Sequence, residues 1–91
     1  MEFRDLVMVL SDFGLWEKVA GCYEGENYLG DEFLEEHIRK YPTSDKLIIR
    51  AIVGIYHGHR LVSFYELYRF LDGENTEKLI KCWRKDFTID K

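Results

Sequence analysis

One segment, Asp45–His57, constrains the fold of this chain more than any other. Its apolar residues recur three and four positions apart, as on a helix, and they spread around most of its circumference. Its β-branched residues leave a strand as an alternative, but its length and the capping residue before it, Thr43 or Ser44, favour a helix. We therefore expect a central helix that ends at Gly58. The expected buried positions are Leu47, Ile48, Ile49, Ala51, Ile52, Val53, Ile55 and Tyr56.

Three helices are predicted before the central one. The apolar spacing predicts helices over Phe3–Phe13 and Leu15–Tyr23. The next stretch, Glu24–Gly30, has two glycines and no apolar period, which predicts a loop. Asp31 then stands where it can cap a third helix, Glu32–Lys40. The inward side of this third helix is expected to comprise Phe33, Leu34, His37 and Ile38, with Tyr41 after its end.

Two more helices are predicted after Gly58. Ser63 is followed three residues later by Glu66, which is the pattern of a capping box. The last helix is expected from Asn75 or Thr76 to about Asp86, with a core face of Leu79, Ile80, Trp83 and Phe87. The expected fold is therefore all-α: a single compact domain over residues 1–91, made of five or six short helices.

The C-terminal helix pair resembles a helix-turn-helix, or the helical core of a winged helix. The matching segments are Ser63–Leu71 and, after a short turn, Thr76–Trp83. The resemblance implies that the second helix lies in the major groove of nucleic acid through its polar face. An ordinary helical hairpin with a solvated basic face is the alternative. The basic residues that would contact nucleic acid are Lys78, Lys81, Arg84 and Lys85.

The charges are distributed unevenly along the chain. The net charge is −4, but residues 1–45 carry a net −7 and residues 46–91 a net +3. A negative first half is a poor surface for a phosphate backbone, whose affinity for proteins comes largely from Lys and Arg. It suits a basic partner, such as the nucleic-acid-binding face of another protein. The positive second half allows local contact with nucleic acid.

Aromatic residues make up 15% of the chain, which is high for 91 residues. The helix that follows Ser63 has an inward stripe of Phe64, Leu67, Tyr68 and Leu71. Tyr65 and Phe70 lie off this stripe, so at least one of them is expected at a contact with a partner or a second copy of the chain. Tyr28 and Leu29, in a loop bracketed by glycines, are a second pair of candidate partner-binding residues. The alternative is that a small core needs large side chains to fill it.

We found no pattern that indicates catalysis. Cys22 and Cys82 stand 60 positions apart, and neither has an evident neighbour that would activate a thiol. His57 and His59 supply at most two ligands to a metal, and the spacing of His37 does not complete a set. We therefore expect no enzymatic activity, no metal site, no cofactor and no small-molecule substrate. The predicted function is protein docking through an aromatic helical surface.

The sequence also suggests a cellular compartment. Met1–Asp5 lacks the features of a signal peptide, and no apolar run approaches the ~18 residues of a membrane span. Two widely separated cysteines fit a reducing compartment with both thiols free. We therefore expect a cytoplasmic protein without membrane contact.

Overall fold

The structure is a computed structural model, and it describes residues 2–58, 66, 69, 73–74, 77–79 and 81. Helices account for 74% of these residues, which supports the predicted all-α class in outline. A small two-stranded antiparallel sheet, absent from the prediction, is added to them. The elements are α1 (Phe3–Asp12), α2 (Trp16–Val19), the 3₁₀ helix η1 (Ala20–Cys22), β1 (Tyr23–Glu24), β2 (Asn27–Tyr28), α3 (Asp31–Ile38) and α4 (Thr43–His57).

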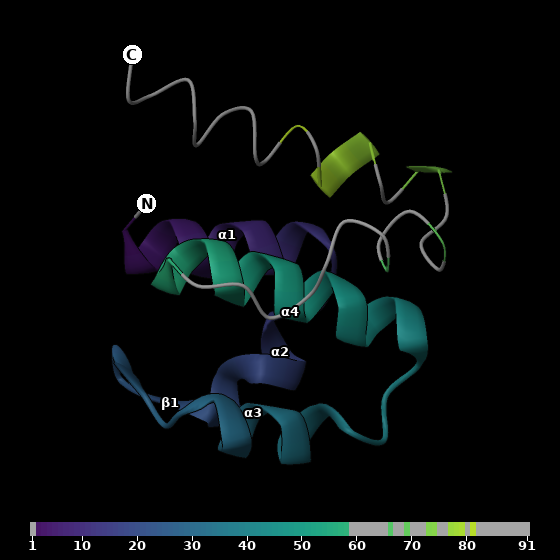
Figure 1. Ribbon diagram of the computed structural model, residues 1–91. Coiled ribbons are helices and arrows are strands. Elements are labelled where there is room, and N and C mark those ends of the chain that lie inside the picture. Colours follow the sequence, from purple (N-terminus) through teal and green to yellow (C-terminus); the bar gives the residue numbers. More distant parts are fainter. Residues whose placement is uncertain are drawn as a thin grey trace.

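Helix α4 lies at the centre of the described elements. Figure 1 shows α1 alongside it on one side, with α2, α3 and the hairpin on the other. Seven consecutive or near-consecutive residues of α4 are buried, so the predicted central helix is confirmed. These residues are Leu47, Ile48, Ile49, Ala51, Ile52, Val53 and Gly54. The prediction that Ile55 and Tyr56 are buried is wrong: both lie near the end of the helix and are half-buried.

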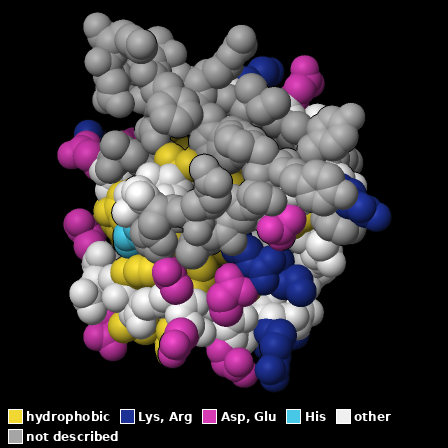
Figure 2. Space-filling model, viewed as in Figure 1, with side chains coloured by type: hydrophobic (Ala, Val, Ile, Leu, Met, Phe, Trp, Pro, Cys, Tyr) yellow, Lys and Arg dark blue, Asp and Glu magenta, His cyan; other side chains and the backbone are white. Residues whose placement is uncertain are grey.

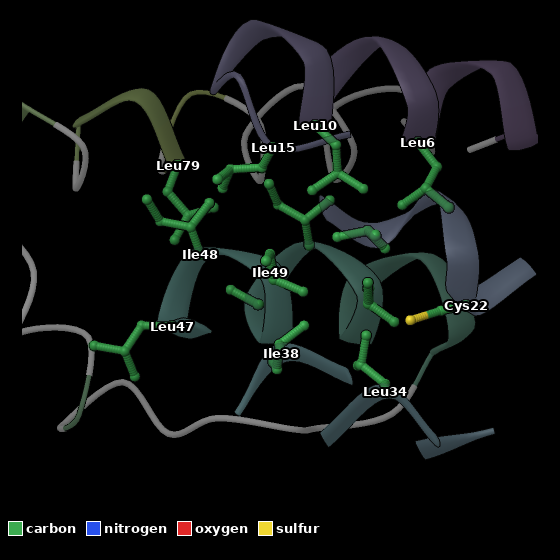
Figure 3. Close-up of a cluster of buried hydrophobic side chains, with 14 of the residues drawn as sticks. Leu6, Leu10, Leu15, Cys22, Leu34, Ile38, Leu47, Ile48, Ile49 and Leu79 are labelled. Carbon is green, nitrogen blue, oxygen red and sulfur yellow. The ribbon is translucent and has the colours of Figure 1, made fainter. Parts of the chain in front are cut away.

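The core is formed where the other elements turn apolar side chains toward α4 (Figure 3). Leu6 and Leu10 come from α1, while Leu34 and Ile38 come from α3, and all four are fully buried. Burying a leucine or isoleucine side chain contributes about 1.5–3 kcal/mol each. Leu79 joins the same cluster at 1% exposure, which confirms it as a core residue of the last predicted helix.

The ends of α4 are set by a proline and a glycine. Gly58 follows the helix with a φ of 76°, in the left-handed conformation that glycine adopts most readily, so the predicted stop is confirmed. The predicted cap is wrong. Pro42, with ψ 154°, is the N-cap residue, while Thr43 and Ser44 are the first residues of the helix. No side-chain hydrogen bond caps this end.

Helix α3 begins one residue earlier than predicted. Its N-cap is Gly30, whose φ of 109° requires glycine, and Asp31 is the first helical residue rather than the cap. The carboxylate of Asp31 instead accepts a hydrogen bond from the hydroxyl of Tyr28 at 2.7 Å. The prediction of a cap at Asp31 is therefore wrong.

The predicted second helix is shorter than expected, and the predicted loop contains a β-hairpin. After α2 and η1 the chain becomes extended at Tyr23, which pairs with Tyr28, while Glu24 pairs with Asn27. Gly25, with a φ of 63°, takes the first central position of the turn, where a type II′ hairpin uses glycine. Each strand has two residues, which is too short for an alternating pattern to be visible in the sequence.

Phe33 was expected to face inward, and this prediction is wrong: its side chain is 45% exposed. Successive helix residues are about 100° apart, so the buried Leu34 next to it points in a different direction. His37 follows Phe33 by one helical turn on the same face of α3, and its ring lies close to Gly21 of η1. The rings of Phe33 and His37 stack with their centroids 6.0 Å apart.

Several predictions fall outside the described residues. They concern Tyr65, Phe70, the capping box at Ser63 and most of the predicted helix-turn-helix. Among the residues that the structure does describe, no helix has both the length and the apolar character needed to cross a membrane.

Candidate functional site

Tyr28 and Leu29, which the sequence predicts as partner-binding residues, lie at the end of the hairpin and are both half-buried. The ring of Tyr28 stacks on that of His57 at a centroid distance of 4.2 Å. The backbone N–H of Leu29 donates to the carbonyl of Cys22 at 2.9 Å. Tyr28 therefore attaches the hairpin to the end of α4, whereas the backbone of Leu29 closes the base of the hairpin itself. Each leaves only part of its side chain for a partner.

A cluster of rings packs between the hairpin, α1 and the end of α4. Phe3 of α1 meets Trp16 and Tyr23 edge to face, at centroid distances of 5.9 Å and 5.3 Å. The hydroxyl of Tyr23 lies 2.9 Å from Nε2 of His57 and forms a hydrogen bond with it. Tyr23 is the one buried ring of this cluster, while Phe3, Trp16, Tyr28 and Tyr56 pack against the core and are half-buried.

Burial keeps the hydroxyls of this cluster protonated. It raises the pKa of Tyr23 well above its usual value, with smaller contributions from Tyr56, Cys22 and Asp31. Burial also raises the pKa of Tyr28, assisted by its hydrogen bond to Asp31. The two hydroxyls therefore act as neutral hydrogen-bonding groups that hold the hairpin in place.

The outer side of α3 carries exposed acidic side chains next to an exposed aromatic ring. Glu32 and Glu36 are exposed one turn apart, and the exposed ring of Phe33 lies beside them on the helix. Figure 2 shows acidic side chains on the lower part of the molecule, where Figure 1 places α3 and the hairpin, with a group of basic side chains beside them at the lower right. We call this area the hairpin–α3 surface, comprising Glu24, Glu26, Glu32, Phe33 and Glu36.

A mixed-charge hollow of about 500 Å³ lies between α3 and α4. Arg50 crosses it and donates two hydrogen bonds to Glu35, and this interaction raises the pKa of Arg50 above its usual value. Acidic and basic groups alternate in the lining, so the hollow does not favour a ligand of either charge. Its lining residues are Asp31, Glu32, Glu35, Glu36, Arg39, Lys46 and Arg50.

The residues predicted for nucleic-acid contact are only partly described. Lys78 is partly buried, and its ammonium donates to the carbonyl oxygen of Asp12 at 3.0 Å. The same ammonium lies 4.5 Å from the centre of the Phe13 ring. Lys81 is exposed, while Arg84 and Lys85 lie outside the described residues. Lys78 thus contacts the end of α1.

Within the described ranges, neither the thiol of Cys22 nor the histidines and acidic residues form a reactive site. Cys22 is fully buried, and burial raises the pKa of its thiol to about 11. The thiol is therefore protonated at neutral pH and is a poor nucleophile. Across residues 2–58 and the described positions beyond them, no three His, Cys, Asp or Glu side chains come together as metal ligands.

Comparison of the chain with protein-family models, with curated proteins and with solved structures finds no match. Its function is therefore inferred from its own residues.

Proposed function

We propose that this chain is a non-enzymatic binding protein that docks on another protein through the hairpin–α3 surface. The observation that carries the proposal is the exposed ring of Phe33 on the outer side of α3. Aromatic side chains surrounded by polar groups are typical anchors of protein interfaces. The predicted candidates Tyr28 and Leu29 precede α3 in the chain and are half-buried, so each leaves part of its side chain accessible to the same partner.

The chemistry of the described side chains supports binding rather than catalysis. Cys22 is a buried, protonated thiol, and the hydroxyls of Tyr23 and Tyr28 form hydrogen bonds within the fold. A catalytic base or nucleophile needs access to a substrate and a proton affinity suited to neutral pH. These groups lack both properties, so they support a structural role.

The alternative function is nucleic-acid binding through Lys78, Lys81, Arg84 and Lys85. It has weaker support, because the ammonium of Lys78 is already bonded to the end of α1. A contact between two copies through the hairpin–α3 surface is also less favourable, since it would bring like charges together. A different protein is the better candidate partner.

The proposal is tested with Phe33→Ser and, as a matched control, Met8→Ser. Met8 is the other large exposed apolar residue of the described part, 62% exposed on α1. The original chain is first used to capture a partner from the native host, and that partner is purified. The original chain and each variant are then titrated against it by calorimetry. We expect the Phe33 variant to bind at least about tenfold more weakly, while Met8→Ser binds like the original protein.

Two outcomes would contradict the proposal. One is that no partner binds the purified chain directly. The other is that Phe33→Ser and Met8→Ser bind equally well. Met8→Ser should keep its free energy of unfolding within about 0.5 kcal/mol, because the side chain is 62% exposed. Phe33→Ser should lose about 1 kcal/mol and stay folded, because its ring is 45% exposed and stacks on that of His37.

A further inference from the structure

We infer that the partner contacts the hairpin–α3 surface with a basic, amphipathic segment: Lys or Arg side chains around an apolar residue that covers Phe33. This inference rests on the proposed function and names the class of partner. It is carried by the charge of the surface together with the exposed ring at its edge.

The stretch from Tyr23 to Ile38 contains six acidic residues and neither Lys nor Arg. Three of the six carboxylates have partners inside the fold. Asp31 accepts from Tyr28, Glu35 from Arg50, and Glu36 pairs with Arg39 at 3.4 Å. Glu24, Glu26 and Glu32 form no hydrogen bond or ion pair with any residue that the structure describes.

Only some of these acidic residues stabilise the fold. Asp31 and Glu32 lie in the first turn of α3, where acidic residues favour the helix dipole. Glu24 and Glu26 have no such role, because they flank or occupy the tight turn of the hairpin. Both are exposed. Their carboxylates are therefore available to a partner without any loss of internal contacts.

Charge complementarity selects the occupant of this surface. The carboxylates of Glu24, Glu26 and Glu32, which no described basic side chain pairs, disfavour phosphate-rich nucleic acid, an anionic lipid surface and a second copy of this surface. The basic residues of the neighbouring hollow, Arg39, Lys46 and Arg50, lie on the α4 side of Glu32, and two of them are already paired with Glu35 and Glu36. A cationic segment would be attracted, and an apolar residue on it would remove the Phe33 ring from water. An amphipathic basic helix combines both properties at helical spacing.

The test uses two probe peptides and the ¹⁵N-labelled full chain. One peptide is an amphipathic helix of about 18 residues built from Lys and Leu, and the other has Glu in place of each Lys. With the Lys peptide we expect amide shift changes concentrated between Glu24 and His37, and affinity at least about tenfold weaker at high salt. The Glu peptide should cause no change in this region.

Two double variants of equal net charge separate a specific site from general attraction. Glu24→Gln with Glu32→Gln neutralises the surface, whereas Asp12→Asn with Glu17→Gln neutralises exposed acids outside it. We expect the first pair to weaken binding of the Lys peptide about tenfold and the second less than about twofold. Equal weakening by both pairs, or shift changes centred elsewhere, would overturn the inference.

The two proposals can fail separately. If Phe33→Ser abolishes binding of the native partner while the Lys peptide does not bind the hairpin–α3 surface, the docking surface stands and the basic partner is wrong. If the Lys peptide binds there but the native partner is unaffected by Phe33→Ser, the proposed docking function is wrong.

Discussion

Arg50 of α4 and Glu35 of α3 form a bidentate ion pair. Nε of Arg50 donates to Oε2 of Glu35 at 2.8 Å, and Nη2 donates to Oε1 at 2.6 Å. The two side chains are 23% and 43% exposed, so water screens them only in part. The pair fixes α3 against the central helix and thereby positions the hairpin–α3 surface.

The first prediction concerns the strength of this pair. In a double-mutant cycle with Arg50→Met and Glu35→Gln, we expect a coupling energy of about 1 kcal/mol, because the contact is planar and partly buried. The pair Arg39–Glu36, which is 77% and 71% exposed, is the control and should give less than about 0.5 kcal/mol. Urea unfolding measures both cycles, and equal couplings would mean that the bidentate geometry adds nothing.

The second prediction concerns the core around Ile52, which is 1% exposed in the middle of α4. Ile52→Ala should lower the free energy of unfolding by about 2–5 kcal/mol, because it leaves a cavity in a packed cluster. Ile52→Val should cost about 0.5–1.5 kcal/mol and guards against a variant that does not fold. A loss below about 0.5 kcal/mol in Ile52→Ala by denaturant titration would show that Ile52 is not part of a close-packed core.

The long helices could be predicted from the sequence, because each shows its apolar period over several turns. The expected range Asp45–His57 differs from the observed α4 by two residues at its start. That error arose at Thr43 and Ser44, because a residue type that favours capping does not reveal whether the backbone there is already helical. The hairpin was missed because two-residue strands contain no measurable alternation.

The candidate site was predicted less well than the fold. The acidic character of the first half was visible in the sequence, but the exposure of Phe33 was not. Phe33 lies at one edge of the inward side that the pattern indicates, and only the packing of α3 in the fold shows which edge stays exposed. Tyr28 was expected to be available to a partner, yet its hydroxyl donates to Asp31 and its ring stacks on that of His57. His57 is far from Tyr28 in the sequence, so this contact is visible only in the folded structure.

The third prediction concerns alkaline pH and Cys22. Burial raises the pKa of its thiol from 9.0 to about 11, so the unfolded chain loses this proton at lower pH than the folded chain. Stability contributed by the neutral thiol is complete below about pH 8 and is lost as the pH rises from 9 to 11. Relative to Cys22→Ala, the original chain should therefore lose about 2 kcal/mol over this range.

Chemical unfolding at a series of pH values measures this difference. Comparison with Cys22→Ala cancels the titration of groups that both proteins share, including the tyrosines. A constant difference in stability between the two proteins from pH 8 to pH 11 would contradict the burial of the thiol.

The last prediction separates two lysines that the sequence assigns to one basic face. Lys78 donates to the carbonyl of Asp12, at the end of α1 where helix carbonyls lack intrahelical partners, and lies over the ring of Phe13. Lys78→Met should therefore lower the free energy of unfolding by about 0.5–1.5 kcal/mol, whereas Lys81→Met, at an exposed position, should change it by less than about 0.5 kcal/mol. Urea unfolding checks both values, and equal effects would mean that the contact with α1 contributes nothing.

A titration with duplex DNA at low salt tests the alternative function with the same variants. If both lysines contacted phosphates, each substitution would weaken binding to a similar extent and reduce its salt dependence. Because the ammonium of Lys78 is engaged within the fold, we expect its substitution to change stability and not DNA binding.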